Sequence, residues 1–235
     1  MVRLFRRRTI RLETGGIRAR FRVDCDHEKW LFRTPMALEP EQKAAMLGAL
    51  RPDDVVYEIG AHIGTWTAFL AKRVPRGAVH AFEPEPTNRR QLEANVRLNR
   101  LRNVSVHPFA VSDRSGTAEF ALTGGERDSC ASLVPDERAV RKVCVDTLRL
   151  DDAPSRLDIP EPAALKIDCE RAEGLVIAGA SSLLDHVRLI YVEIHEGVEQ
   201  SGWTQERLLD HLERAGFGIA ERWTRSTQTQ LLLKR

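Results

Sequence analysis

Two glutamates and two glycines follow apolar segments in the first half of the sequence, in an order typical of a nucleotide-like site. The apolar run that starts at Val55 leads into Glu58, Gly60 and Gly64, and Glu83 ends the next apolar run. Glycines at such a turn let the backbone approach a ligand closely, and a carboxylate can face a cation or accept two hydrogen bonds from a ribose diol. The fingerprint G-x-G-x-x-G and the Walker lysine are both missing. Because S-adenosylmethionine carries an ammonium and a sulfonium group, the two acids favour this ligand over a phosphate-rich nucleotide.

A second polar set lies in the last third of the chain and consists of Asp168, Glu170, Glu173, Glu193 and His195. An alcohol that receives a methyl group needs a base, since its own pKa is far above neutrality. We predict that Asp168 is the general base or a metal ligand, and that His195, which titrates near neutral pH, is the second candidate base. The oxygens of Asp168, Glu170 and Glu193 suit Mg²⁺ or a similar hard cation. The alternative is a solvated helix start, where acids meet the helix dipole favourably.

The elements that must position these residues alternate between strand and helix from residue 39 onward. We predict strands from Val55 and at 78–82, 104–109, 163–167 and 189–195, and helices at 39–50, 65–73, 86–98, 172–184 and 204–215. This order builds an α/β fold, a mostly parallel doubly wound sheet with helices on both faces, and residues 217–221 and 229–233 close it as an antiparallel hairpin. Ligands bind beyond the carboxyl ends of such strands. The turn that we predict from Ala110 to Asp113 falls there, with Glu58, Gly60 and Glu83.

The first 38 residues follow a different pattern. Residues 17–23 alternate strictly between apolar and polar, so they predict a half-buried strand that pairs with residues 9–12, and residues 30–32 predict another short strand. We therefore expect a β appendage at 1–38 and the main domain at 39–235. Predicted strands 117–122 and 141–145 flank a loop, 123–140, which is long enough to be a substrate loop or lid.

Composition excludes several classes of protein. The chain has 235 residues, a net charge of +2, 42% hydrophobic and 30% charged residues, as expected for one globular domain. This charge gives no field that points to nucleic acid, although arginines crowd the N-terminus as a frayed start or an anion-attracting surface (Arg3, Arg6, Arg7, Arg8 and Arg11). No signal peptide and no membrane span are expected. Four scattered cysteines indicate reduced thiols in a cytoplasmic protein.

Several motifs together resemble the FkbM-type methyltransferases. Residues 58–64, E-I-G-A-H-I-G, are similar to the family motif D/E-x-G-A-N-x-G, and F-E-P-E-P-T-N at 82–88 resembles its F-E-P-x-P-x-N segment. The runs A-V-S-D at 110–113 and A-S-L at 131–133 also match. L-K-I-D-C-E-R-A-E at 165–173 resembles L-K-I-D-V-E-G-A-E, and V-E-I-H at 192–195 resembles the next strand. The resemblance covers about residues 55–195.

The resemblance implies a Rossmann-like methyltransferase fold, S-adenosylmethionine as donor, and a hydroxyl acceptor on a small molecule, a sugar or a natural product. The donor would contact the residues Glu58, Gly60, Ala61, Gly64, Glu83, Pro84, Ala110 and Asp168. In this chain His62 replaces an asparagine, Cys169 an aliphatic residue and Arg171 a glycine. We expect Arg171 to pair with Glu170 or Glu173 or to reach an anionic substrate, and we expect Glu173 and Arg171 on the substrate side.

Other functions compete with this interpretation. A nucleic-acid methyltransferase would use the N-terminal arginines, but the balance of charge and the missing Asn/Asp-Pro-Pro-Tyr/Phe motif argue against it. A non-catalytic Rossmann-like binding module is disfavoured, because Glu58, Glu83 and Asp168 are retained. A dehydrogenase is disfavoured by the glycine pattern. The sequence does not identify the acceptor, and it leaves open whether the chain forms a homodimer.

Overall fold

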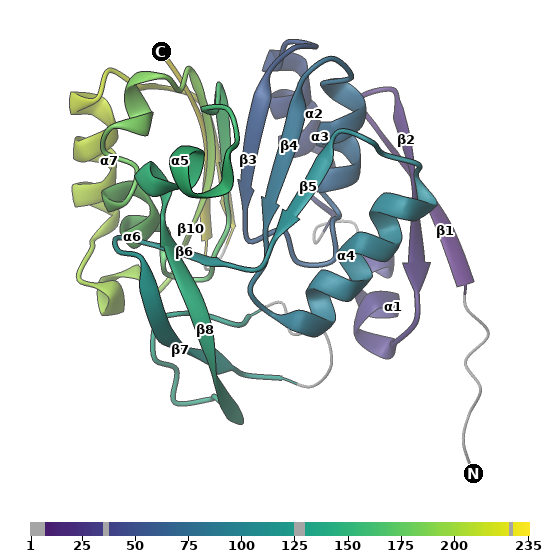
Figure 1. The fold of residues 1–235 in the computed structure, drawn as a ribbon, viewed down its shortest axis with the longest axis horizontal. Helices are drawn as coiled ribbons and strands as arrows, with labels where there is room; N and C mark the ends of the chain where they lie inside the picture. The colour runs from purple at the N-terminus through teal and green to yellow at the C-terminus, as the bar shows by residue number, and fades with distance from the viewer. Residues whose placement is uncertain (1–7, 35–37, 125–129, 226–227) are drawn as a thin grey trace.

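A computed structural model describes residues 8–34, 38–124, 130–225 and 228–235 (Figure 1). The arginines at positions 3, 6 and 7 lie outside these residues, and so does part of the predicted loop 123–140, namely 125–129. All further statements concern the described residues.

A seven-stranded sheet forms the centre of the fold, in the order β11-β12-β10-β9-β3-β4-β5. Strands β5, β4, β3, β9 and β10 are parallel, whereas β12 is antiparallel to both β10 and β11. This is the predicted sheet with its antiparallel C-terminal hairpin. The strands are β3 (Val55–Ile59), β4 (Ala78–Phe82), β5 (Val104–His107), β9 (Ala164–Ile167), β10 (Leu189–His195), β11 (Gly218–Arg225) and β12 (Gln228–Lys234).

Helices cover both faces of this sheet, because the central strands send apolar side chains to both sides. Tyr57 and Ile59 of β3 belong to the core cluster on one face, and Val56 belongs to the cluster on the other. The first face carries α5 (Ala153–Leu157), α6 (Glu173–Ala178) and α7 (Gln205–Arg214), and the second carries α2 (Pro40–Ala49), α3 (Thr67–Arg73) and α4 (Pro86–Leu98), as Figure 1 shows on either side of the sheet.

Two smaller β units flank the main sheet. A hairpin of β1 (Arg8–Thr14) and β2 (Ile17–Val23) packs on α3 and α4 and is followed by α1 (Asp26–Arg33). A three-stranded sheet of β6 (Ala110–Ser112), β8 (Arg141–Arg149) and β7 (Gly116–Leu122) lies beyond the carboxyl edge of the main sheet (Figure 1). Short 3-10 turns at Leu150–Asp152, Leu183–Asp185 and Val198–Ser201 complete the fold.

The structure corrects three of the predicted elements. Residues 30–32 are helical and lie in α1, because the helix begins after Cys25 with acids in its first turn. The predicted turn at 110–113 is strand β6, which pairs in parallel with β8. The predicted helix 172–184 is divided, since α6 stops at Ala178, before Gly179, which packs so closely on the backbone of Ser112 that a Cβ would not fit there.

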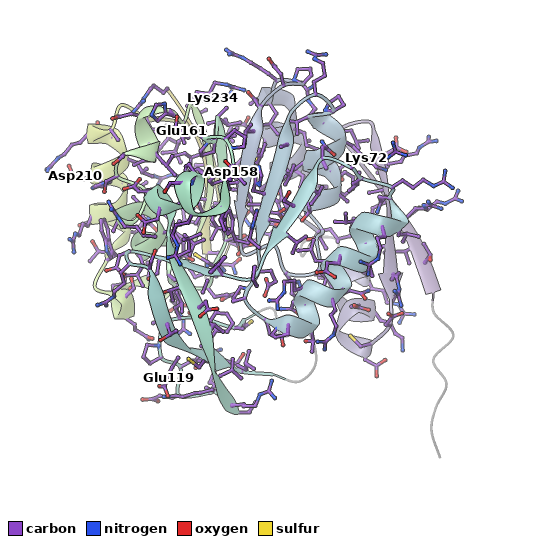
Figure 2. All side chains as sticks on the ribbon, in the orientation of Figure 1. Lys72, Glu119, Asp158, Glu161, Asp210 and Lys234 are labelled. Atoms are coloured by element: carbon purple, nitrogen blue, oxygen red, sulfur yellow. The ribbon has the colours of Figure 1, made fainter. Side chains whose placement is uncertain are left out.

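Charged side chains lie mostly outside the layered core. In Figure 2 the labelled residues Glu119, Asp158 and Asp210 come from different elements and are exposed. No helix in the described part of the chain has the length and apolar character required to cross a membrane. The buried charges instead gather at the carboxyl edge of the main sheet, where Glu58, Lys166 and Glu193 are at most 5% exposed.

Gly60 allows the turn after β3 to approach the end of β9. Its φ is +76°, and a Cβ at this position would overlap the carbonyl oxygen of Asp168. Gly16, in the turn between β1 and β2, has nearly the same φ, +75°, but nothing lies within 4 Å of its Cβ position. A side chain at Gly16 would therefore experience backbone strain alone, whereas a side chain at Gly60 would experience both strain and steric overlap.

We predict that Gly60→Ala lowers the free energy of unfolding by about 3 kcal/mol or more, since strain and overlap both contribute. Gly16→Ala carries the strain alone and should cost about 1 kcal/mol. Urea denaturation followed by circular dichroism measures both values. Equal costs for the two variants would show that the contact between the Gly60 turn and β9 is not tight.

Candidate active site

A cavity of about 590 Å³ runs along the carboxyl edge of the main sheet. The order of the strands fixes which residues meet in it: the turn after β4 supplies Glu83, the turn after β3 supplies Gly60, and the ends of β9 and β10 supply Asp168 and His195. Strand β7 of the small sheet and the segment between β7 and β8 add an apolar wall that includes Phe120, Ala131 and Leu133.

At the β3–β4 end, backbone atoms form the cavity wall. The N–H groups of Gly60 and Ala61 both donate to the carbonyl oxygen of Phe82, each at 3.1 Å, which ties the turn to the neighbouring strand. Gly64 has a φ of +85°, and a Cβ there would lie 2.6 Å from Leu92 of α4. A side chain at Gly60 would therefore displace the turn from the end of β9, and a side chain at Gly64 would displace it from α4.

Glu83 is held by backbone donors at the same end of the cavity. Its Oε2 accepts from the N–H of His62 at 2.8 Å, and its Oε1 accepts from the N–H of Glu85 at 2.9 Å. Burial raises the pKa of Glu83 to about 7, against these two hydrogen bonds, which lower it. Asn88 Nδ2 is a third, longer donor to Oε1, at 3.5 Å. The carboxylate is thus fixed in orientation and still lines the cavity.

Glu58 lies behind the cavity wall rather than in it. Its side chain is fully buried, Oε2 accepts from the Thr67 hydroxyl at 2.6 Å, and Oε1 has no hydrogen-bond partner among the described residues. Burial raises the pKa of Glu58 to about 7, although Lys166, its register partner in β9, favours the charged form. A direct contact with a ligand would require this side chain to move.

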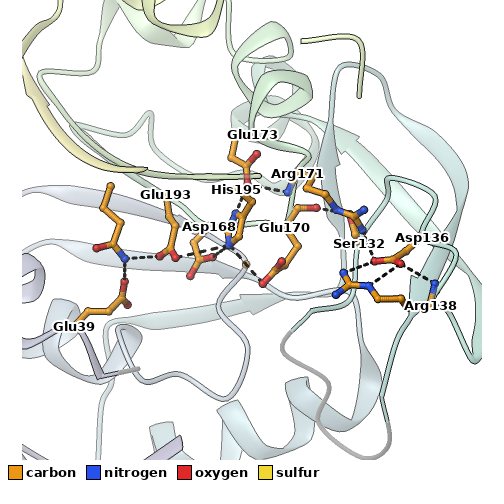
Figure 3. Close-up of polar contacts among 12 residues, drawn as sticks. Glu39, Ser132, Asp136, Arg138, Asp168, Glu170, Arg171, Glu173, Glu193 and His195 are labelled. Atoms are coloured by element: carbon orange, nitrogen blue, oxygen red, sulfur yellow. Dashed lines mark hydrogen bonds and ion pairs between the residues drawn. The ribbon is translucent and has the colours of Figure 1, made fainter. Parts of the chain in front are cut away.

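At the β9–β10 end, four carboxylates surround one imidazole (Figure 3). His195 Nδ1 lies 2.7 Å from Glu173 Oε1. On the other side, His195 Nε2 lies 3.5 Å from Glu170 Oε1 and 3.8 Å from both Asp168 Oδ1 and Glu193 Oε1. The histidine side chain is only 6% exposed.

The close approach of these buried groups shifts their pKa values and so determines their charges at neutral pH. Burial lowers the pKa of His195, but the hydrogen bond to Glu173 and the neighbouring carboxylates outweigh it and raise the value to about 10. Burial, together with the charges of Asp168 and Glu39, raises the pKa of Glu193 to about 9. Asp168 behaves oppositely: burial favours its acid form, but the Lys166 ammonium at 3.0 Å holds the pKa of Asp168 below its usual range. At neutral pH the site therefore holds an imidazolium and an ionised aspartate side by side.

Glu39 connects the N-terminal part of the chain to this cluster. It lines the cavity, and its two oxygens accept hydrogen bonds from Trp66 Nε1 at 2.8 Å and from the Tyr191 hydroxyl at 3.0 Å. Gln230 Nε2 donates to Glu39 and also to Glu193 Oε2, at 2.9 Å. Glu39 begins a predicted helix, and nothing in its local sequence pattern indicates this contact with strands more than 150 residues away.

The cavity brings together most of the residues singled out from the sequence. It is lined by Gly60, Ala61, Glu83, Pro84, Ala110, Asp168, Glu170, Glu193 and His195. Glu58, Gly64, Glu173 and Arg171 are not among the lining residues. The Arg171 guanidinium does not pair with Glu170 or Glu173 as expected: it contacts Asp136 and Gln200, and the backbone N–H of Arg171 bonds to Glu173.

The chain is similar in sequence to known methyltransferases and to one region of a much longer synthetase. The chain is 27% identical over 199 residues to the hexuronic acid methyltransferase AglP of Haloferax volcanii (82% of this chain, 77% of AglP). It is 29% identical over 178 residues to the 31-O-demethyl-FK506 methyltransferase FkbM of Streptomyces tacrolimicus (63% and 67%). The AMB antimetabolite synthetase AmbE of Pseudomonas aeruginosa is 34% identical over 215 residues (74% of this chain), but the match spans only 10% of AmbE.

Solved structures with the same fold have unrelated acceptors in their titles. A precorrin-6y C5,15-methyltransferase from Geobacter metallireducens has a TM-score of 0.51 at 13% identity, covering 83% of this chain and 88% of that one. A putative rRNA methylase from Clostridium thermocellum has a TM-score of 0.52 at 12% identity, with coverages of 83% and 95%. At these identities the comparison establishes a Rossmann-like methyltransferase fold and leaves the acceptor undetermined.

The sequence model described as the methyltransferase FkbM domain matches residues 58–219, which is more than half of the chain and includes the strand ends that form the cavity. The chain belongs to the FkbM methyltransferase family.

Proposed function

We propose that this protein transfers a methyl group from S-adenosylmethionine to a hydroxyl group of a sugar or another small natural product. The observation that carries the proposal is the continuity of the cavity, which joins the Glu83 end to the carboxylate–histidine cluster. The 31-O-demethyl-FK506 methyltransferase FkbM supports an oxygen of a natural product as the acceptor, and the hexuronic acid methyltransferase AglP supports a sugar as the acceptor molecule.

The residues at the β3–β4 end fit the donor. Gly60 and Ala61 line the cavity, so a ligand there lies against a turn without bulky side chains, and two N–H groups hold the Glu83 carboxylate, which also lines the cavity. We assign the ribose diol to Glu83 and the remaining donor contacts to Gly60, Ala61, Pro84 and Ala110. When bound, S-adenosylmethionine supplies an electrophilic methyl group on a sulfonium centre.

The groups at the β9–β10 end fit proton removal from an alcohol. Asp168 is partly exposed to the cavity, with 27% of its side chain accessible, and the Lys166 ammonium keeps it ionised. In the proposed reaction Asp168 accepts the hydroxyl proton as the oxygen gains its methyl group. His195 was the second candidate base, but an imidazolium cannot accept a proton; in this proposal it stabilises the charges around the acceptor instead.

We predict that Asp168→Asn reduces the turnover number about 100-fold or more, since it removes the base, and that His195→Ala also reduces it. Binding of S-adenosylhomocysteine should change little in either variant. The assay measures transfer of a labelled methyl group to a panel of sugars and hydroxylated metabolites, and calorimetry measures the binding. Full turnover by both variants would refute the assigned roles.

Donor affinity should depend on pH through Glu83. Only the carboxylate offers acceptors for both ribose hydroxyls, and the pKa of Glu83 is raised to about 7. We therefore predict that S-adenosylhomocysteine binds less tightly as the pH falls from 8 to 6, and that Glu83→Gln binds weakly at every pH. Calorimetry of both proteins over this range is the measurement. An equal pH dependence in the glutamine variant would assign the effect to another group.

We also propose that the cluster binds a divalent cation. Single ligand atoms of Asp168, Glu193 and His195 lie within 4.8 Å of one another, and Glu170 faces the same ring nitrogen. Glu173 holds the opposite ring nitrogen, as carboxylates do for histidines that bind metals. A cation such as Mg²⁺ or Mn²⁺ would then replace the imidazolium proton.

If the cation takes part, EDTA should abolish methyl transfer and added Mg²⁺ should restore it, with S-adenosylhomocysteine binding unchanged. The transfer assay is run with protein that has been dialysed against the chelator. Activity that persists at its full value after dialysis would exclude the cation and leave the imidazolium as the positive charge of the cluster.

A further inference from the structure

One wall of the cavity consists of residues from the segment between β7 and β8. Cys130, Ala131 and Leu133 line the cavity. Two hydrogen bonds between the backbones of Ser132 and Ala121, at 2.8 and 3.0 Å, attach this segment to β7. These bonds fix the segment to the small sheet but not to the strand ends that carry the charged cluster.

Contacts with residues 170 and 171 supply the missing connection (Figure 3). The Ser132 hydroxyl donates to the carbonyl oxygen of Glu170. Nη2 of Arg171 lies 2.8 Å from Oδ2 of Asp136, and Nη1 donates to Oε1 of Gln200 at 3.0 Å. The side chains of this ion pair are 9% and 4% exposed, so the pair is shielded from water.

The backbone at Arg171 is unfavourable for an arginine. Its φ is +73° and that of Glu170 is +49°, in the left-handed region that favours glycine. Glycine is the residue that the family motif has at this position. For the backbone, an arginine at this position is less favourable than a glycine. Any stabilising effect of Arg171 therefore comes from its side-chain contacts.

The same residue also reaches the catalytic cluster. The N–H of Arg171 donates to Oε1 of Glu173 at 2.9 Å, and this oxygen lies 2.7 Å from His195 Nδ1. Arg171 therefore contacts the cluster through its backbone N–H, and the segment that carries this wall through its guanidinium.

We propose that Arg171 is a positioning residue whose buried ion pair with Asp136 fixes residues 130–134 as the acceptor-side wall of the cavity, and thereby narrows the range of acceptors that fit. The identification of this wall with the acceptor rests on the proposed function.

Arg138 provides a matched control. It binds the same Asp136 carboxylate, at 2.8 Å, but its side chain is 75% exposed and its hydrogen bonds go to Asp136, only two residues away. Removing Arg138 takes one cation from Asp136 without breaking the connection to the main sheet. Removing the Arg171 side chain breaks the ion-pair part of that connection while Arg138 still neutralises the carboxylate.

The test is hydrogen–deuterium exchange of the peptide that covers residues 130–140 in the otherwise unmodified chain. Arg171→Gly, which suits the positive φ, and Asp136→Asn should each speed exchange about tenfold or more, because a buried pair loses its partner. Arg171→Lys retains one contact and should remain close to the wild type. Arg138→Ala should change the rate less than about threefold. Wild-type exchange in both Arg171→Gly and Asp136→Asn, or an equal effect in Arg138→Ala, would overturn the proposal.

A kinetic measurement separates positioning from a general loss of structure. In the methyl-transfer assay Arg171→Gly should raise the KM for the acceptor about tenfold while kcat and the KM for the donor change little. A fall in kcat alone would contradict a role in shaping the wall. Calorimetry of S-adenosylhomocysteine with the wild type tests the donor site separately: if it shows no binding while Arg171→Gly still exchanges faster, the proposed function fails and the structural connection stands.

Discussion

The central constraint on the site is electrostatic: four carboxylates lie close together in a buried part of the fold, around one histidine. Glu173, Glu170, Asp168 and Glu193 all lie within 3.8 Å of His195, where isolated charges would be strongly destabilised. The imidazolium offsets part of this cost, and the proton that Glu193 retains, with its pKa raised to about 9, offsets more. An arrangement of this kind stabilises positive charge, which suits a reaction whose donor is a cation.

The surrounding structure supports this cluster from three directions. Lys166 fixes Asp168 from within β9, and α6 presents Glu173 to the far side of the histidine ring. Gln230 of β12 joins Glu193 to Glu39, so that a residue before the first helix of the main domain also supports the site. Because β9 and β10 are neighbours in the sheet, these contacts all meet at one edge.

Much of the fold could be predicted from local pattern, and the site only in part. Alternation of strands and helices predicts the parallel sheet, and the strand ends identify Glu83, Asp168 and His195 before any contact is known. Contacts between distant segments leave no such signal: Asp136 meets Arg171, and Glu39 meets Gln230, through the tertiary fold alone. The error at residues 30–32 has a similar cause, since a short apolar run does not distinguish strand from helix without its neighbours.

In the proposed site the donor lies with its ribose on Glu83 and its sulfur toward Asp168 and His195. A crystal structure of the protein with S-adenosylhomocysteine measures this directly. We predict that the ribose hydroxyls bond to the Glu83 carboxylate and that the sulfur faces the space next to Asp168. A ligand bound elsewhere, or one whose sulfur points away from the cluster, would contradict the proposed division of the cavity into a donor end and an acceptor end.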